Sequence, residues 1–136
     1  YCLSGGDGES RCFGRQNSAW HFAALSKKEA EKALLPLIEG YRQGRSSPLL
    51  LLPKTGWAWL NNCFDKDSGA VDWDEQTQSK AQMKLLLAWQ GDQRVIGEGS
   101  DPYIQRVMRT MDEKRLREIQ QLAEQYYLPL ARSNLA

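Results

Sequence analysis

The sequence predicts an α+β fold that is rich in helices. Apolar residues recur at helical spacing over most of the chain, whereas strand-like patterns occur only near the amino terminus and in a few short runs. Because these strands do not alternate regularly with helices, a doubly wound sheet is not expected. The 136 residues, 41% hydrophobic and 26% charged, have the size and composition of one globular domain. We therefore expect a single domain over residues 1–136.

The first expected element is an amino-terminal β-hairpin. Segments 10–13 and 19–22 both carry aromatic residues and flank the polar, glycine-containing loop 14–18. Before them, Tyr1-Cys2-Leu3 is apolar, lacks an initiator methionine and runs directly into a turn-rich stretch. Such a triplet would leave its backbone groups without partners. We therefore expect the chain to be the C-terminal fragment of a larger polypeptide.

A capping box predicts the start of the first helix. The Ser26 side chain is placed to accept a hydrogen bond from the backbone of Glu29, and the Glu29 side chain is placed to return one. Pro36 removes one internal hydrogen bond and predicts a kink or a break into two shorter helices, and the element should end between Gly44 and Pro48. One apolar face at helical spacing is expected to be buried; it contains Ala30, Ala33, Leu34, Leu37, Ile38 and Tyr41.

The run Pro48-Leu49-Leu50-Leu51-Leu52-Pro53 predicts a buried strand. Four consecutive leucines between two prolines, which cannot donate to a sheet ladder, are typical of a strand covered on both faces. A short helix from about Thr55 to Phe64 should follow, carrying Trp57 and Trp59. Packing is therefore expected to dominate this part of the chain.

Three more helices are expected in the second half, which makes about five in all. The first follows the acidic segment 72–75 and stops at Gly91, with a short strand at Val95-Ile96 after it. Asp101-Pro102 then supplies an N-cap and a proline at the first helical position. The last helix should begin near Thr110 or Asp112 and end at Pro129. The buried side around the fourth helix should contain Ile104, Val107, Met108 and Met111.

Charge and cysteine content exclude several classes of protein. With 18 basic and 17 acidic residues, the net charge of +1 provides no global field that would draw the chain to nucleic acid, so any DNA contact must be local. Three cysteines at unrelated spacings argue against a disulfide framework and a structural zinc site. No apolar stretch is long enough to cross a bilayer. We expect a cytoplasmic protein with no membrane partner.

An acidic loop is the main candidate for metal chemistry. It contains Asp65, Asp67, Asp72, Asp74 and Glu75, whose oxygens are the ligands that hard cations prefer, but the spacing of a calcium-binding loop is absent. Asp112-Glu113-Lys114 has the acid-x-Lys order of some metal-dependent nucleases, yet acidic residues also favour a helix start on electrostatic grounds. A metal-dependent nuclease that uses loop 65–75 and Lys114 therefore stays open as the alternative function.

Nothing else in the sequence indicates catalysis. His21 is the only histidine; it lies between Trp20 and Phe22 and has no serine or cysteine at a motif-like spacing, which favours a structural or surface role. Gly97-Glu98-Gly99-Ser100 lacks the lysine of a phosphate-binding loop and indicates a turn. We expect no catalytic residue, no cofactor and no metal ligand.

Aromatic and basic residues are the candidates for binding. Five tryptophans offer more aromatic surface than a chain of this length normally hides, and aromatic side chains are enriched at binding anchors. Trp57 and Trp59 cannot share one helix face, so one of them is the better candidate. The partner-binding candidates are Trp57, Trp59, Tyr126 and Tyr127. The DNA-binding candidates are Arg106, Arg109, Arg115 and Arg117, with Arg42, Arg45 and Lys114 as further members of the same basic set.

Several short motifs occur in order along the whole chain. They are Gly5-Gly6-Asp7-Gly8-Glu9-Ser10, Leu37-Ile38-Glu39-Gly40-Tyr41-Arg42 with Gly44, Pro48-Leu49-Leu50 with Leu52-Pro53, Ala58-Trp59, Gly97-Glu98-Gly99 and Leu128-Pro129-Leu130. With this ordered combination, the whole chain resembles the extreme C-terminal part of the gamma chain of exodeoxyribonuclease V, the RecC family.

The resemblance implies part of a degenerate nuclease-like domain that has lost its catalytic residues. Such a domain would serve in a heterotrimer with the two helicase chains, beta and alpha, and would guide DNA during ATP-dependent processing of double-strand breaks. No catalytic residue of the family transfers to this chain. We expect an apolar patch with a polar rim where a partner subunit binds, and an isolated fragment could form a homodimer through that patch.

Overall fold

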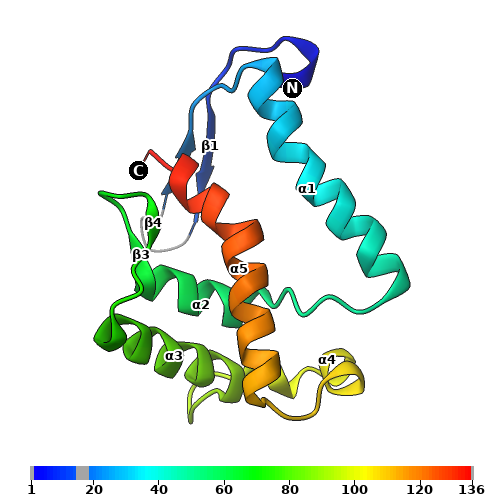
Figure 1. The fold of residues 1–136 in the computed structure, drawn as a ribbon, viewed down its shortest axis with the longest axis vertical. Helices are drawn as coiled ribbons and strands as arrows, with labels where there is room; N and C mark the ends of the chain where they lie inside the picture. Colours follow the sequence, from blue (N-terminus) through cyan, green and yellow to red (C-terminus); the bar gives the residue numbers. More distant parts are fainter. Residues whose placement is uncertain (1, 15–18, 136) are drawn as a thin grey trace.

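The computed structural model describes residues 2–14 and 19–135 and shows a helix-rich α+β arrangement (Figure 1). The described residues form five α-helices and two sheets of two strands each. In chain order the elements are η1 (Cys2–Ser4), β1 (Ser10–Phe13), β2 (Ala19–Phe22), α1 (Lys27–Ser46), α2 (Pro53–Cys63), β3 (Phe64–Asp65), β4 (Ala70–Val71), α3 (Glu75–Gln90), η2 (Glu98–Ser100), α4 (Pro102–Val107) and α5 (Glu113–Ser133). The expected fold class and the expected number of helices are confirmed.

The core lies where α2 packs against α3 and α5 (Figure 1). Its largest fully buried side chains are Trp59 and Leu60 of α2, Leu85 of α3, Ile119 of α5 and Met108, which follows α4. Cys63 is buried among them, and this burial raises the pKa of its thiol from 9.0 to about 11. By contrast, α1 runs along the outside of this body, at the upper right of Figure 1.

The amino-terminal hairpin is confirmed. Strands β1 and β2 pair antiparallel, with Cys12 opposite Trp20 and Ser10 opposite Phe22. Trp20 stacks on Phe22 and also lies against Trp57 of α2, with 5.1 Å between the ring centroids of the two tryptophans. Within the expected loop, residues 15–18 lie outside the described residues. This aromatic contact fastens the hairpin to the core.

Helix α1 begins at the expected capping box but does not break at Pro36. The Ser26 hydroxyl accepts from the Glu29 backbone, and the Glu29 carboxylate accepts from the Ser26 backbone N–H at 2.9 Å. One continuous helix spans Lys27–Ser46, so the expected break into two helices is wrong. Pro36 and Lys32, whose carbonyl loses its donor, are both exposed, so water can satisfy that carbonyl.

The expected leucine-rich strand is wrong. Residues 48–52 are irregular, although Leu50 and Leu52 are buried as the pattern predicted. The described residues provide no neighbouring strand to form a ladder with this segment. Pro53 does not close a strand; it fills the first turn of α2, where a missing N–H costs nothing. The helix expected over about 55–64 is confirmed, with bounds Pro53–Cys63.

The structure also contains a second, shorter hairpin that the sequence did not predict. Strands β3 and β4 pair Phe64 with Val71 and Asp65 with Ala70. The Asp65 carboxylate accepts from the backbone N–H groups of Asp67 and Ser68, and Gly69 has φ +64°, which suits glycine. The polar loop that the sequence marks is therefore the turn of this hairpin.

The helix boundaries predicted around α3 and α4 are largely confirmed. Asp74 caps α3, Asp101 caps α4, and Gly91 ends α3 with φ +78°, a conformation that glycine alone adopts readily. The expected strand at Val95-Ile96 is reduced to one bridge between Ile96 and Gly91. Met108 is buried as expected, but Val107 is 48% exposed, so its expected burial is wrong.

Helix α5 continues through Pro129 to Ser133, so the expected end at Pro129 is wrong. Both Pro129 and Gln125, whose carbonyl would have accepted the missing N–H, are exposed to water. The Ser133 hydroxyl donates to the Pro129 carbonyl at 2.8 Å and ties the last turn together. The buried face contains Ile119, Ala123 and Leu128.

A buried carboxylate caps the start of α2. Leu52 stands at the N-cap position, and its apolar side chain cannot accept a hydrogen bond from the first backbone N–H groups of the helix. Instead, the Glu98 side chain accepts from the Lys54 N–H at 3.1 Å and from the Thr55 N–H at 2.7 Å. Only 9% of Glu98 is exposed. A negative group at this helix end also interacts favourably with the helix dipole, so one side chain of η2 holds the amino end of α2.

Glu98→Ala should lower the free energy of unfolding by about 2 kcal/mol, because the buried Thr55 N–H and the partly buried Lys54 N–H lose their acceptor. Denaturant unfolding followed by circular dichroism measures the change. Thr55→Val is the control: the Thr55 hydroxyl is buried without a hydrogen-bond partner among the described residues, so its removal should leave stability equal or higher. Equal stability of Glu98→Ala and the parent would contradict this role of Glu98.

Candidate interaction surfaces

Trp57 and Trp59 occupy opposite sides of α2. Trp59 is fully buried, and its ring N–H donates to the Gln78 side-chain oxygen at 3.2 Å. Trp57 is half-buried between Trp20 and Tyr127, with a centroid distance of 6.0 Å to Tyr127. A partner cannot reach Trp59 in this fold, so its assignment as a partner-binding residue is corrected: its ring is part of the core.

The two adjacent tyrosines of α5 have different surroundings. Tyr127 packs against Trp57, and partial burial, with a smaller contribution from the Glu98 carboxylate, raises its pKa from 10.0 to about 12. Tyr126 lies against Gly40 of α1, where a methyl group on the glycine would come within 2.3 Å of the tyrosine hydroxyl. Tyr126 therefore marks the place where α1 and α5 touch, and both rings remain partly accessible.

The apolar face of α1, which we expected to be buried, is exposed. Tyr41 is 70% exposed and Leu37 is 53% exposed, and Leu34 and Ile38 are also open to solvent. The buried residue of this helix is Gly40. We call these four side chains, Leu34, Leu37, Ile38 and Tyr41, the α1 face. These exposed apolar side chains thus lie on a helix face that the sequence predicted to be covered.

A second exposed apolar group lies on α3, at the opposite end of the molecule in Figure 1. Met83 and Leu87 are one helical turn apart, and they are 67% and 47% exposed. Ile96, 79% exposed, is bridged to Gly91 just beyond the end of the same helix. We call Met83, Leu87 and Ile96 the α3 face. The sequence carries no clear signal for it, because Met and Leu at helical spacing usually indicate a core.

The four candidate DNA-binding arginines fall into two pairs. Arg115 bonds to the Asp112 carboxylate at 3.2 Å and to the Thr110 carbonyl, and Arg117 bonds to the Glu113 carboxylate at 3.0 Å. These partners place Arg115 and Arg117 in the first turns of α5 as local ion pairs. Their charges are therefore already matched inside the chain.

Arg106 and Arg109 have a different setting. The Arg106 guanidinium lies 5.8 Å from the centre of the exposed Tyr103 ring. Together with Pro102 and Gln105, the two arginines line a shallow surface depression. Among the described residues, neither arginine forms an ion pair with a carboxylate. Arg42 and Arg45, the other arginines of the expected patch, lie on α1 instead.

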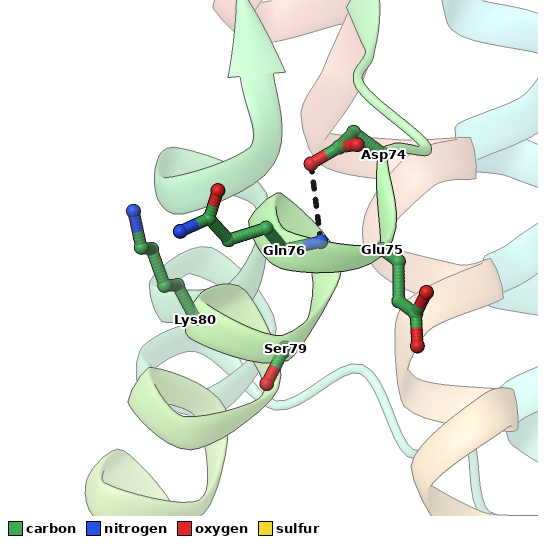
Figure 2. A pocket seen from close by; sticks show the side chains of 5 residues that line it. All are labelled: Asp74, Glu75, Gln76, Ser79 and Lys80. Carbon is green, nitrogen blue, oxygen red and sulfur yellow. Dashed lines mark hydrogen bonds between the residues drawn. The ribbon is translucent and has the colours of Figure 1, made fainter.

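The acidic residues of loop 65–75 serve local structure. Asp65 holds the β3–β4 turn, and the Asp74 carboxylate accepts from the backbone of Gln76 and Thr77. Figure 2 shows the Asp74 carboxylate turned back to the start of α3 while Glu75 points away from it. In the described part of the chain, no three His, Cys, Asp or Glu side chains come together as metal ligands would.

Lys114 is far from the β3–β4 turn. Arg132, near the end of α5, donates to the Gly69 carbonyl of that turn. Lys114 is in the first turn of the same helix, about 27 Å away at 1.5 Å per residue. The turn, which carries Asp65 and Asp67, and Lys114 therefore cannot act on one bound ion.

His21 has a structural setting. Its ring bonds to the Glu9 carboxylate at 2.8 Å, and this contact holds the pKa of Glu9 below its usual value. Its backbone N–H donates to the Asn134 side chain. The backbone bond to Asn134 joins the hairpin to the C-terminal segment. They agree with the expectation of a structural or surface histidine.

Comparison with known proteins supports the resemblance noted in the sequence. A family model described as the RecC C-terminal domain matches residues 2–64. The RecBCD enzyme subunit RecC of Escherichia coli (strain K12) is 43% identical over 134 residues, which is 98% of this chain. The chain belongs to the RecC family. The proteins of the same name from Buchnera aphidicola of Acyrthosiphon pisum and of Schizaphis graminum are 32% and 34% identical over 98% and 89% of the chain.

This RecC-family chain spans about an eighth of the length of the relatives that it matches, 12% of the Escherichia coli protein. The matched family model covers the hairpin, α1, the leucine-rich segment and α2, whereas α3, α4 and α5 lie beyond it. The α1 face is therefore inside the matched domain and the α3 face is outside it. No described helix has the length and apolar content that a membrane span needs.

Asp74→Ala should lower the free energy of unfolding by about 1 kcal/mol, because α3 loses its N-cap, and Asp74→Asn should keep most of the stability.

Magnesium or manganese at millimolar concentration should shift the melting temperature of neither variant nor parent, because Asp74 serves as a cap. Calorimetry with and without metal measures both effects. A metal-dependent rise in the parent that Asp74→Ala abolishes would instead place a cation at this loop.

Proposed function

We propose that this chain is the non-catalytic C-terminal portion of a RecC subunit, where it serves subunit assembly and DNA guidance. On this proposal it is one domain, part of a degenerate nuclease-like domain, and it works in the cytoplasm within the exodeoxyribonuclease V heterotrimer. The partners are the two helicase chains, and the parent complex processes double-strand breaks with ATP. The identity to RecC relatives over nearly the whole chain supports this assignment.

The single observation that carries the assembly role is the excess of exposed apolar surface. The α1 face and the α3 face lie at opposite ends of a small body, and large side chains such as Tyr41, Met83 and Ile96 are mostly open to solvent. Large exposed apolar patches on soluble proteins often mark interaction sites. Two such faces on one chain suit a piece that is held between neighbours.

The geometry gives no support to the nuclease alternative. Asp65, Asp72 and Asp74 of loop 65–75 accept backbone hydrogen bonds at a turn or helix start, and Lys114 lies about 27 Å along α5 from Arg132, which contacts the β3–β4 turn. An enzyme of that class brings carboxylates and a lysine to one ion. The non-catalytic proposal therefore agrees better with the placement of these groups.

The residues proposed to meet the helicase chains are those of the α3 face, together with the accessible parts of Trp57, Tyr126 and Tyr127. Met83→Glu and Leu87→Glu in the RecC subunit should weaken its affinity for the helicase chains at least about tenfold, because each places a charge in an apolar contact. Surface plasmon resonance or a quantitative pull-down measures this affinity.

Gln82→Glu is the matched control for the α3 face. It adds the same charge to an exposed position of the same helix, beside the apolar stripe, and should leave the affinity within about twofold. Because Met83 and Leu87 are exposed, thermal denaturation should show that all three variants remain folded. A loss of affinity then reports on binding and not on folding. Unchanged affinity in folded Met83→Glu and Leu87→Glu subunits would remove the α3 face from the assembly role.

We propose DNA contact at α4 because Arg106 and Arg109 lack intramolecular partners among the described residues. Their guanidinium groups share one depression beside the exposed Tyr103 ring, which suits phosphate contact next to a stacking surface. Arg115 and Arg117 would first have to give up Asp112 and Glu113. The proposed DNA contact is therefore narrower than the set of four arginines that the sequence indicates.

Arg106→Ala and Arg109→Ala should each weaken DNA binding similarly for all sequences and reduce the salt dependence of log affinity by about one unit of slope. Fluorescence anisotropy over a salt series measures both quantities in the RecC subunit. Arg117→Ala, which removes an exposed ion-paired charge, is the control and should change the slope less. An equal or larger effect of Arg117→Ala would argue against a specific role for α4.

A further inference from the structure

Tyr103 is an exposed aromatic residue on a fixed backbone. It is 77% exposed, while the next residue, Ile104, packs against the core. The Asp101 carboxylate accepts from the backbone N–H groups of Tyr103 and Ile104 at 2.8 and 3.4 Å, and Pro102 fills the first position of α4. Helix α4 thus holds the Tyr103 backbone in place and leaves its ring to solvent, which lowers the entropy cost of a contact there.

Tyr103 and Arg106 form a cation–π pair one helical turn apart. The central carbon of the Arg106 guanidinium lies 5.8 Å from the ring centroid. This contact uses none of the N–H donors of the guanidinium, so they stay available to an anion. Arg109 lines the same surface depression as Arg106 and, like it, has no carboxylate partner in the described part of the chain. The ring therefore lies beside two cations that the fold does not neutralise.

The ring distinguishes an unpaired DNA strand from a duplex. In a duplex the bases stack on one another inside the helix, and its surface presents phosphates and groove edges, so an exposed tyrosine finds no base face to cover. An unpaired strand offers both phosphates and free base faces, and proteins bind it by aromatic stacking beside basic groups. The combination of Tyr103 with two arginines therefore matches an unpaired strand.

The charges around α4 favour the same form of DNA. The Asp101 carboxylate at the start of the helix is negative, and the arginines in the first turns of α5, Arg115 and Arg117, are matched by carboxylates. Duplex binding through phosphates alone gains its affinity from many neutralised phosphates, and the two remaining arginines supply few. A stacked base adds affinity that does not depend on the number of phosphates. The site therefore gains more from an unpaired strand than from a duplex.

We propose that α4 binds single-stranded DNA, with one base stacked on the Tyr103 ring and the neighbouring phosphates on Arg106 and Arg109. This inference rests on the proposed function, because it names the form of DNA that the α4 contact takes. Stacking gives affinity without base-specific hydrogen bonds, so strands of different sequence should bind alike. An acidic peptide would use the arginines but leave the ring unused.

Photocrosslinking in the RecC subunit locates the contact. The probe is an oligo-dT strand of about 12 nucleotides in which one thymine is replaced by 5-iodouracil, a photoreactive base that crosslinks to aromatic side chains stacked on it. Mass spectrometry of the digested subunit should find a nucleotide adduct on Tyr103. Relaxed circular duplex DNA, which has no ends, should need at least about tenfold more nucleotides than unlabelled oligo-dT to suppress this adduct. A poly-glutamate peptide should suppress it less than oligo-dT of equal charge.

Substitution of Tyr103 gives a second measurement. Tyr103→Leu removes the ring and should weaken oligo-dT binding at least about fivefold, while duplex affinity stays within about twofold. The salt dependence of log affinity should not change, because the arginines remain. Tyr103→Phe is the matched variant that keeps the ring, and it should restore oligo-dT binding. Fluorescence anisotropy measures these affinities, and thermal denaturation checks that both variants fold, as expected at an exposed position.

Several results would overturn the single-strand proposal. They are equal suppression of the adduct by duplex and oligo-dT, absence of the adduct from Tyr103, and an equal effect of Tyr103→Leu on both forms of DNA. Equal suppression by poly-glutamate would also overturn it and would assign α4 to an acidic protein surface. With any of the first three results, DNA contact at α4 still stands if Arg106→Ala and Arg109→Ala reduce the salt dependence. If these two variants also have no effect, the proposed DNA contact fails as well.

Discussion

The Glu98 carboxylate at the start of α2 is the contact on which the rest of the structure depends. Helix α2 lies between the other core helices, yet the residue before it is a leucine, which cannot cap it. The acceptor comes from 44 positions further along the chain. Gly99, next to it, lies so close to the Trp89 ring that a methyl group would come within 2.5 Å of the ring. The same short turn therefore caps α2 and packs on α3, which couples the two helices and fixes the surface against which α5 packs.

This coupling divides the molecule into a cohesive part and a loosely held part. Helices α2, α3 and α5 share the fully buried residues. The hairpin is attached through Trp20 and Trp57, and α1 is attached near Gly40 and Tyr126. Leu37 and Tyr41 of α1 are already more than half exposed, whereas the largest side chains of the core are fully buried. The regions of lowest local stability are thus those with the fewest buried contacts, and they are also the regions nearest to the uncovered apolar surface.

Prediction from sequence succeeded where the physics is local. The capping box at Ser26 and Glu29 and the cap at Asp101 each involve residues at most three apart, so spacing alone reveals them. It failed where partners are distant: the Glu98 cap, the β3–β4 pairing and the exposure of α1 depend on tertiary contacts. The predictions that helices would break at Pro36 and end at Pro129 failed for another reason. Both stand on exposed helix faces, where water replaces the lost hydrogen bond. Spacing also placed Trp57 and Trp59 on different sides of one helix but could not tell which side faces the core.

The side chains available for binding are those that form no core contact, helix cap or ion pair within the fold. Four aspartates are negatively charged groups that could serve as ligands, but each accepts a backbone hydrogen bond at a turn or a helix start. They are Asp65, Asp74, Asp101 and Asp112. Arg115 and Arg117 are matched by neighbours within one helical turn. Once these groups are assigned, the charges that remain near α4 are Arg106 and Arg109, and the apolar groups that remain are on α1 and α3. A nearly neutral chain can therefore still present a local positive site. The net charge of +1 is a sum over the whole sequence, so it does not describe the local surface at α4 that a partner would meet.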